Sequence, residues 1–133
     1  MLLTMEILIQ EAKNIIDKRY VQNKFGVGSA IRMKFGKIYT GISINSQKID
    51  LCAEWVAIGK AFSEGDYDIE MIVAVKRHND GSYEIYPPCG LCRELFMTYC
   101  PEAEVIISET RKIKTKDLLP DAWQKKKIIN TEV

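Results

Sequence analysis

The chain of 133 residues is short of three things: net charge, long apolar runs and histidine. Its 19 Lys and Arg residues balance 18 Asp and Glu residues, which gives a formal net charge of +1. Binding along a polynucleotide is supported by a marked excess of basic residues, so this balance argues against a nucleic acid polymer as the main partner. The one basic run, Lys125–Lys127, is expected to be the solvated face of a last helix.

No uncharged stretch approaches the roughly 18 apolar residues that a membrane span requires, so no membrane partner is expected. The segment MLLTMEILIQ is apolar, but it has no basic leader and Glu6 interrupts it, which argues against a secretory signal. Four cysteines without an export signal indicate a reducing cytoplasm, where a Cys-x-x-Cys pair favours metal or redox chemistry over a structural disulfide. The length and the hydrophobic fraction of 47% fit one domain, residues 1–133, with one sizeable core.

Hydrophobic periodicity predicts an alternation of helices and strands. Thr4 is the expected N-cap of a first helix, because apolar residues recur at helical spacing after it. Further helices are predicted over about 51–63 and 90–99. Strands are predicted over 27–33, 37–45, 71–75 and 103–108, and the segment 76–84 is expected to be a loop. This alternation is typical of an α/β domain with three layers.

The stretch PPCGLCREL places Cys89 and Cys92 at the start of a predicted helix. Such a pair can be half of a metal site, a redox couple or two buried thiols. Cys52 also begins a predicted helix, and a helix N-terminus favours thiolates through its dipole and its free N–H groups. Three thiolates from two helix starts would leave the fourth tetrahedral position of a Zn²⁺ ion open, as in a catalytic site.

Glu54 lies two residues after Cys52, in the same helical turn, where a carboxylate can move protons beside an ion without being a ligand. Cys-x-Glu followed by Pro-Cys-x-x-Cys is the three-cysteine form of the zinc-deaminase pattern. Cys100 has no partner motif and is expected to be a buried free thiol. The single histidine, His78, lies in a charged loop and is expected to be solvated.

With this pattern the chain resembles the cytidine deaminase family in its small three-cysteine form, which includes blasticidin-S deaminase. The matching segments, in the family's order between residues 20 and 123, are KFGVGSAI, GKIYTGISI, CAEWVAIGKAFSEGD, PPCGLCREL and DLLPDAW. The resemblance implies a three-layer α/β/α domain with a five-stranded mixed sheet and one Zn²⁺ per subunit. It also implies a homotetramer in which neighbouring subunits complete each pocket.

The resemblance further implies hydrolytic deamination of a free cytosine nucleoside, cytidine or deoxycytidine, to the uracil nucleoside and ammonia. Zn²⁺ held by Cys52, Cys89 and Cys92 lowers the pKa of a water towards about 7. Glu54 protonates ring atom N3 and then carries a proton to the departing amine. Two alternatives remain: an aminoacyl-nucleoside antibiotic such as blasticidin S as the substrate, or a non-catalytic zinc-stabilised module in which Cys100 or His78 is a fourth ligand.

The substrate contacts also follow from the resemblance. Ser43 and Asn45 stand where relatives carry an Asn and a Glu that bind ribose, and blasticidin-S deaminase lacks that Glu too. A neutral amide in place of a carboxylate weakens a hydrogen bond, because charge-assisted bonds are about twice as strong. Phe25 and Ala53 are expected at the base pocket, and Trp123 is expected to reach a neighbouring subunit's pocket.

The charge of the predicted metal site also needs compensation. Three thiolates on Zn²⁺ leave a net charge of −1, which opposes ionisation of water. The helix N-termini at Cys52 and Cys89 are one source of compensation, and Arg93 is the candidate for another. Many relatives carry Arg directly after the Cys-x-Glu, where this chain has Trp55.

Overall fold

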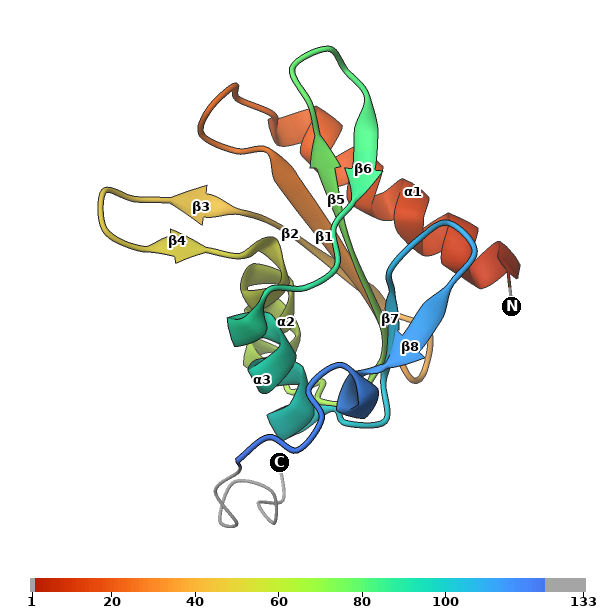
Figure 1. Cartoon of the computed structure of the whole chain (residues 1–133). Helices are drawn as coiled ribbons and strands as arrows, with labels where there is room; N and C mark the ends of the chain where they lie inside the picture. The colour runs from red at the N-terminus through yellow and green to blue at the C-terminus, as the bar shows by residue number, and fades with distance from the viewer. Residues whose placement is uncertain (1, 124–133) are drawn as a thin grey trace.

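A computed structural model describes residues 2–123 as a mixed sheet covered by helices on both faces (Figure 1). The helices are α1 (Leu2–Arg19), α2 (Ala53–Ser63) and α3 (Gly90–Tyr99), with a short 3₁₀ turn η1 (Thr115–Asp117). The strands are β1 (Val27–Met33), β2 (Ile38–Ile42), β3 (Ile44–Asn45), β4 (Asp50–Leu51), β5 (Ile69–Arg77), β6 (Tyr83–Ile85), β7 (Glu104–Ile106) and β8 (Lys112–Lys114). The helix expected around Lys125–Lys127 lies outside the described residues.

The main sheet has the order β2-β1-β5-β7-β8, and β6 pairs with the end of β5. β5 and β7 run parallel, whereas the other neighbouring strands are antiparallel. β3 and β4 form a separate two-stranded ribbon. The three layers and the mixed sheet are therefore confirmed. None of the helices in residues 2–123 is long and apolar enough to cross a bilayer.

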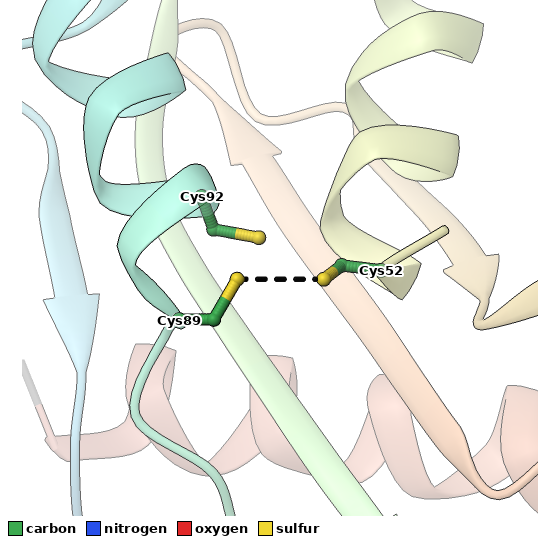
Figure 2. A group of neighbouring side chains, drawn as sticks. All are labelled: Cys52, Cys89 and Cys92. Atoms are coloured by element: carbon green, nitrogen blue, oxygen red, sulfur yellow. Dashed lines mark hydrogen bonds between the residues drawn. The ribbon is translucent and has the colours of Figure 1, made fainter. Parts of the chain in front are cut away.

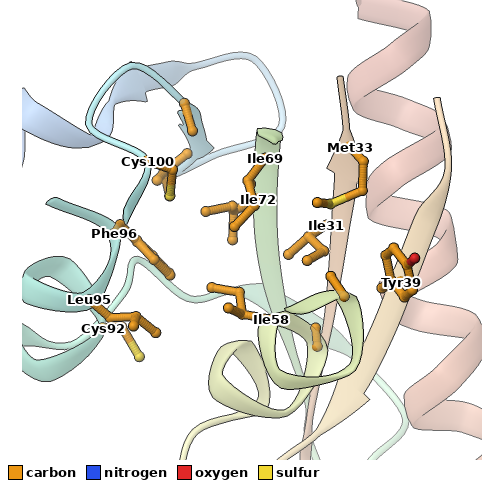
Figure 3. Packing of buried hydrophobic residues seen from close by; sticks show 14 residues of the cluster. Ile31, Met33, Tyr39, Ile58, Ile69, Ile72, Cys92, Leu95, Phe96 and Cys100 are labelled. Atoms are coloured by element: carbon orange, nitrogen blue, oxygen red, sulfur yellow. The ribbon is translucent and has the colours of Figure 1, made fainter. Parts of the chain in front are cut away.

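β5 lies in the middle of the sheet and is buried on both faces, as its continuous apolar run predicts. Val73 and Val75 pack on the side that α1 covers. Ile72 packs on the opposite side with Ile58 of α2 and Phe96 of α3 (Figure 3). The sheet thus separates two apolar clusters, and the predicted site lies at the edge of the second one.

Several predicted boundaries are wrong. Thr4 lies inside α1 instead of capping it, because Leu2 and Leu3 are good helix formers and extend the helix before it. The strand predicted over 37–45 divides at Ser43, because β1 begins at Val27 and offers no partner further along. Ile44 and the next residue pair with β4 instead.

Three short strands are missing from the sequence prediction: β4, β6 and β8. β6 overlaps the end of the predicted loop 76–84, and β8 carries the sequence KIK. Two or three residues are too few to show a period of two. Pairing with β3, β5 and β7 defines these strands, and such pairing is a property of the folded chain.

Gly41 allows α2 to lie directly on β2. A Cβ atom at this position would be 2.6 Å from the backbone nitrogen of Ala57 and 2.7 Å from the carbonyl oxygen of Ala53. Both neighbours are backbone atoms of a helix and cannot rotate away. Glycine at this position therefore sets the depth at which α2 begins, and with it the position of Cys52.

Candidate metal and substrate site

The N-termini of α2 and α3 bring three sulfur atoms together on one side of the sheet (Figure 2). Cys52 is the N-cap residue of α2, Cys89 is the N-cap residue of α3, and Cys92 lies in the first turn of α3. The three Sγ atoms lie within 4.8 Å of one another, and those of Cys52 and Cys89 are 3.5 Å apart. The structure therefore gathers the three predicted ligands at one point.

The spacing of these sulfurs fits Zn²⁺. A tetrahedral site with Zn–S bonds of about 2.3 Å places its sulfurs about 3.8 Å apart. The soft thiolate donors are also those that zinc prefers. Among residues 2–123 the group has no fourth ligand, so a tetrahedral ion held here would keep one position for another molecule.

The surroundings of the three thiols differ. Burial, followed by a hydrogen bond with Cys89, raises the pKa of Cys52 to about 11. Burial and the charge of Glu54 also raise the pKa of Cys92. Burial acts in the same direction on Cys89, but the backbone N–H groups of Cys92 and Leu91 and the neighbouring thiols bring its pKa below the ordinary value. The N-terminus of α3 thus stabilises the Cys89 thiolate, as the helix dipole argument predicts. The same prediction is wrong for Cys52, because burial outweighs the effect of the N-terminus of α2 on its pKa.

Glu54 lies in the first turn of α2 and is only 5% exposed. Burial raises the pKa of its carboxyl group, while hydrogen bonds from its own backbone N–H and from the Cys92 side chain act in the opposite direction. The carboxyl group therefore lies beside the sulfur group and is withdrawn from bulk solvent.

A cavity of about 220 Å³ opens next to the sulfurs. Its wall includes six of the predicted site residues: Cys52, Ala53, Glu54, Cys89, Ser43 and Asn45. Ser43 is buried, and its hydroxyl oxygen accepts a hydrogen bond from the Val27 N–H at 3.2 Å. Asn45 is exposed on the β3–β4 ribbon, where it lies opposite Asp50.

Phe25 and Trp123 do not line this cavity. Phe25 is half-buried in a turn closed by backbone bonds with Val21, directly before Gly26, which does line the cavity. Trp123 is 79% exposed in the single chain. The role of Trp123 stays a prediction, because this residue is expected to serve a neighbouring subunit. The contact of Phe25 with the base pocket also stays a prediction, because this cavity wall does not include Phe25.

Arg93 makes its bonds away from the sulfurs. Its Nε donates to the carbonyl oxygen of Pro88 at 2.8 Å, and its Nη1 donates to that of Leu118 at 3.1 Å. These bonds tie the segment that precedes Cys89 to the segment after η1. Both hydrogen bonds go to carbonyl oxygens. The expected role of Arg93 in compensating the charge of the metal site stays a prediction.

Cys100 and His78 lie outside the three-sulfur group. Cys100 follows the last turn of α3, about 12 Å along the helix from Cys92 at 1.5 Å per residue. Burial raises the pKa of its thiol to about 12, as expected for an inert buried cysteine. His78 lies 3.0 Å from the Glu84 carboxylate through its Nε2. Neither residue provides the fourth ligand that a closed structural site would need.

Three further polar side chains in the cavity wall are absent from the sequence prediction: Asp50, Lys76 and Tyr86. The strand predicted over 71–75 stops one residue before Lys76. Continuing its alternation would have placed Lys76 on the same face as Ile72 and Ala74. Asp50 has no such signal, because it reaches the cavity through the pairing of β3 with β4.

Residues 4–109 match the family model described as "Cytidine and deoxycytidylate deaminase zinc-binding region". The chain is 38% identical to blasticidin-S deaminase from Bacillus cereus over 122 residues, which cover 85% of this chain and 87% of that protein. It is 33% identical to cytidine deaminase from Halalkalibacterium halodurans over 126 residues, which cover 89% and 92%.

Solved structures of cytidine deaminases have the same fold. The enzyme from Bacillus anthracis superposes with a TM-score of 0.78 at 26% identity, covering 90% of this chain and 89% of that one. The enzyme from Mycobacterium tuberculosis superposes with a TM-score of 0.75 at 27% identity, covering 90% and 96%.

Proposed function

Because this chain belongs to the cytidine and deoxycytidylate deaminase family, whose members are hydrolytic deaminases, we propose that it converts a free cytosine nucleoside to the uracil nucleoside and ammonia. One observation carries the proposal. Three sulfurs that could hold a metal ion lie beside a buried carboxyl group in the wall of a cavity.

Cys52, Cys89 and Cys92 would hold the ion. A Zn²⁺ ion there supplies Lewis acidity, which brings a water close to ionisation near neutral pH. Glu54 then takes one proton from the attacking water and passes it to ring atom N3. It passes the second proton to the amine at C4, which leaves as ammonia while the oxygen of water becomes the C4 carbonyl. A carboxyl group whose pKa is raised by burial suits both the basic and the acidic step.

The sugar would lie against Ser43, Asn45 and Asp50, which line the cavity beyond the catalytic group. Asp50 offers a charged acceptor from the strand opposite Asn45. It could restore the charge-assisted hydrogen bond that Asn45 cannot make, because a carboxylate accepts more strongly than an amide.

An aminoacyl-nucleoside antibiotic such as blasticidin S is the second candidate substrate. The specific observation in its favour is Asn45, which removes the acidic group that relatives acting on cytidine use for ribose. The similarity to a blasticidin-S deaminase points the same way. Both substrates present the same cytosine ring, so the roles of Glu54 and the three cysteines are unchanged.

A homotetramer of one-domain subunits in the cytoplasm is part of the same proposal. Large apolar side chains are exposed at Ile49 beside the β3–β4 ribbon, at Leu91 in the first turn of α3 and at Trp123. A neighbouring subunit would cover them and could receive the Trp123 ring in its pocket. A reducing compartment suits the site, because oxidation could join the Cys52 and Cys89 sulfurs, which are 3.5 Å apart.

Loss of ultraviolet absorbance on incubation with cytidine, deoxycytidine, cytosine and blasticidin S tests the proposal and separates its two substrates. Turnover of cytidine or deoxycytidine supports the first candidate, and turnover of blasticidin S alone supports the second. Glu54→Ala should keep one zinc per chain and lose at least ~10²-fold in kcat. Normal turnover by this variant, or no turnover of any compound by the zinc-loaded wild type, would refute the proposal.

A further inference from the structure

Lys76 places a cationic side chain in the wall of the cavity that contains the three sulfurs. Ile72 packs toward α2 and α3, so the alternation of β5 turns Ala74 and Lys76 to the same side, and both line the cavity. The Lys76 ammonium lies over Gly26, because a Cβ atom at Gly26 would be only 2.2 Å from the Lys76 Nζ. The Lys76 ammonium can therefore occupy this position only because Gly26 has no side chain.

The ammonium has no carboxylate partner within ion-pair distance among residues 2–123. Asp50 and Glu54 line the same cavity without pairing with it. Glu84 stands opposite Lys76 in the β5–β6 pair, but its carboxylate lies 3.0 Å from His78 Nε2. A cation that a ligand partly removes from water needs an anionic partner, because unpaired charges are costly to desolvate.

The cytosine ring must lie with its amine at the sulfurs and Glu54, so the sugar faces the remaining wall. We infer that Lys76 is a specificity-determining residue that binds an anionic substituent on the sugar side of the substrate, either a carboxylate or a phosphate. This inference rests on the proposed function. The net charge of +1 gives the whole molecule little attraction for anions, so a preference for an anionic substrate would come from this local contact.

Steady-state kinetics on three compounds that share the cytosine ring test the inference. Cytidine has an uncharged sugar, cytidine 5′-carboxylic acid carries a carboxylate, and cytidine 5′-monophosphate carries a phosphate. The quantity to compare is kcat/KM for each anionic compound divided by kcat/KM for cytidine. For the anion that fits, this ratio should fall about tenfold or more in Lys76→Met, mainly through KM. Which of the two ratios falls identifies the anion as carboxylate or phosphate.

Three further variants distinguish loss of the contact between Lys76 and the anion from a general change in the structure or charge of the protein. Lys76→Arg keeps the charge and should recover part of the ratio. Gly26→Ala should lower it although Lys76 is present, because the added methyl group displaces the ammonium. Lys18→Met removes an exposed charge from α1 and should leave the ratio as in the wild type. An unchanged ratio in Lys76→Met, or an equal fall in Lys18→Met, would overturn the inference.

Binding of product-type ligands, measured by calorimetry, tests the role of Lys76 even if the protein has no deaminase activity. Uridine, uridine 5′-carboxylic acid and uridine 5′-monophosphate bind without turnover. If the wild type deaminates neither these three cytosine compounds nor blasticidin S, the proposed function fails, and the ratio of the binding constants for anionic and neutral ligands still reports on Lys76. Tighter binding of one anionic ligand that disappears in Lys76→Met supports the inference, and equal binding of all three ligands by the wild type overturns it.

Discussion

Helices pack on both faces of the sheet through apolar clusters, but only one face carries the candidate site. On one face α1 packs through Leu8 and Ala12 against Val73 and neighbouring strand residues, and every member of the cluster is apolar. On the other face α2 and α3 pack in the same way around Ile72 and Phe96. The difference lies at the helix ends, because α2 and α3 both begin at the same place, next to the cavity.

A glycine sets the distance between sheet and helix on each face. A Cβ atom at Gly28 would lie 2.6 Å from the carbonyl oxygen of Ala12 in α1. A Cβ atom at Gly41 would lie 2.6 Å from the backbone nitrogen of Ala57 in α2. The contact at Gly28 positions α1, which carries none of the predicted site residues. The contact at Gly41 positions α2, whose N-terminal end carries Cys52 and Glu54, so this glycine also affects the position of the site residues.

The largest expected effect comes from Cys92, and Cys100 is its matched control, because both are buried cysteines of the α3 segment. Cys92→Ser should lose zinc and more than about 100-fold in activity, because changes to outer-shell partners alone cost 10–100-fold. Cys100→Ser should keep one zinc per chain and the wild-type kcat per folded molecule, with a stability loss of about 1 kcal/mol. Metal analysis and kinetics on both proteins check this, and zinc loss in Cys100→Ser would mean that the metal group is larger than three sulfurs.

The two glycines give the next largest effect. Gly28→Ala and Gly41→Ala should each cost about 1–3 kcal/mol of stability, measured by denaturant unfolding, because backbone atoms stand in the way. Gly41→Ala should also lower kcat by about 10–100-fold, since a shift of 1 Å in a catalytic group can cost 10²-fold. The activity of folded Gly28→Ala should stay within about twofold of the wild type. Equal activity losses in the two variants would erase the functional difference between the faces.

Removal of zinc by a chelator should affect the two faces unequally. Amide hydrogen exchange at the first turns of α2 and α3 should accelerate about tenfold more than exchange in the middle of α1, because the ion ties only those turns together. Return of the wild-type pattern on adding Zn²⁺ is the control. Uniform acceleration across both faces would show that the ion stabilises the whole domain instead.

The smallest effect is expected at Gly59, which is exposed in α2 and has no atom within 4 Å of a Cβ built on it. Gly59→Ala should raise stability by about 0.5–1 kcal/mol through helix propensity. Kinetic constants should not change, in contrast with Gly41→Ala. A loss of stability, measured by thermal or denaturant unfolding, would indicate that another molecule contacts this face of α2.

The sequence predictions succeeded where the signal is local. The apolar run of β5 and the helical starts at Cys52 and Cys89 can be read within a few residues. The turn positions of Glu54 and Cys92 follow from helical geometry. Predictions failed where pairing decides, as at Ser43, where β2 gives way to the β3–β4 ribbon, and at Asp50, which that ribbon brings to the cavity.

The kind of chemistry could be predicted from the chain alone, because the donor atoms of the Cys-x-Glu and Cys-x-x-Cys segments are each arranged within one helical turn. The meeting of these two segments depends on long-range packing. Cys52 and Cys89 are 37 positions apart in the chain, yet their sulfurs are 3.5 Å apart because two helices pack on one face of the sheet. Long-range pairing also brings Asp50 to the cavity wall, since no short segment specifies that β4 pairs with β3.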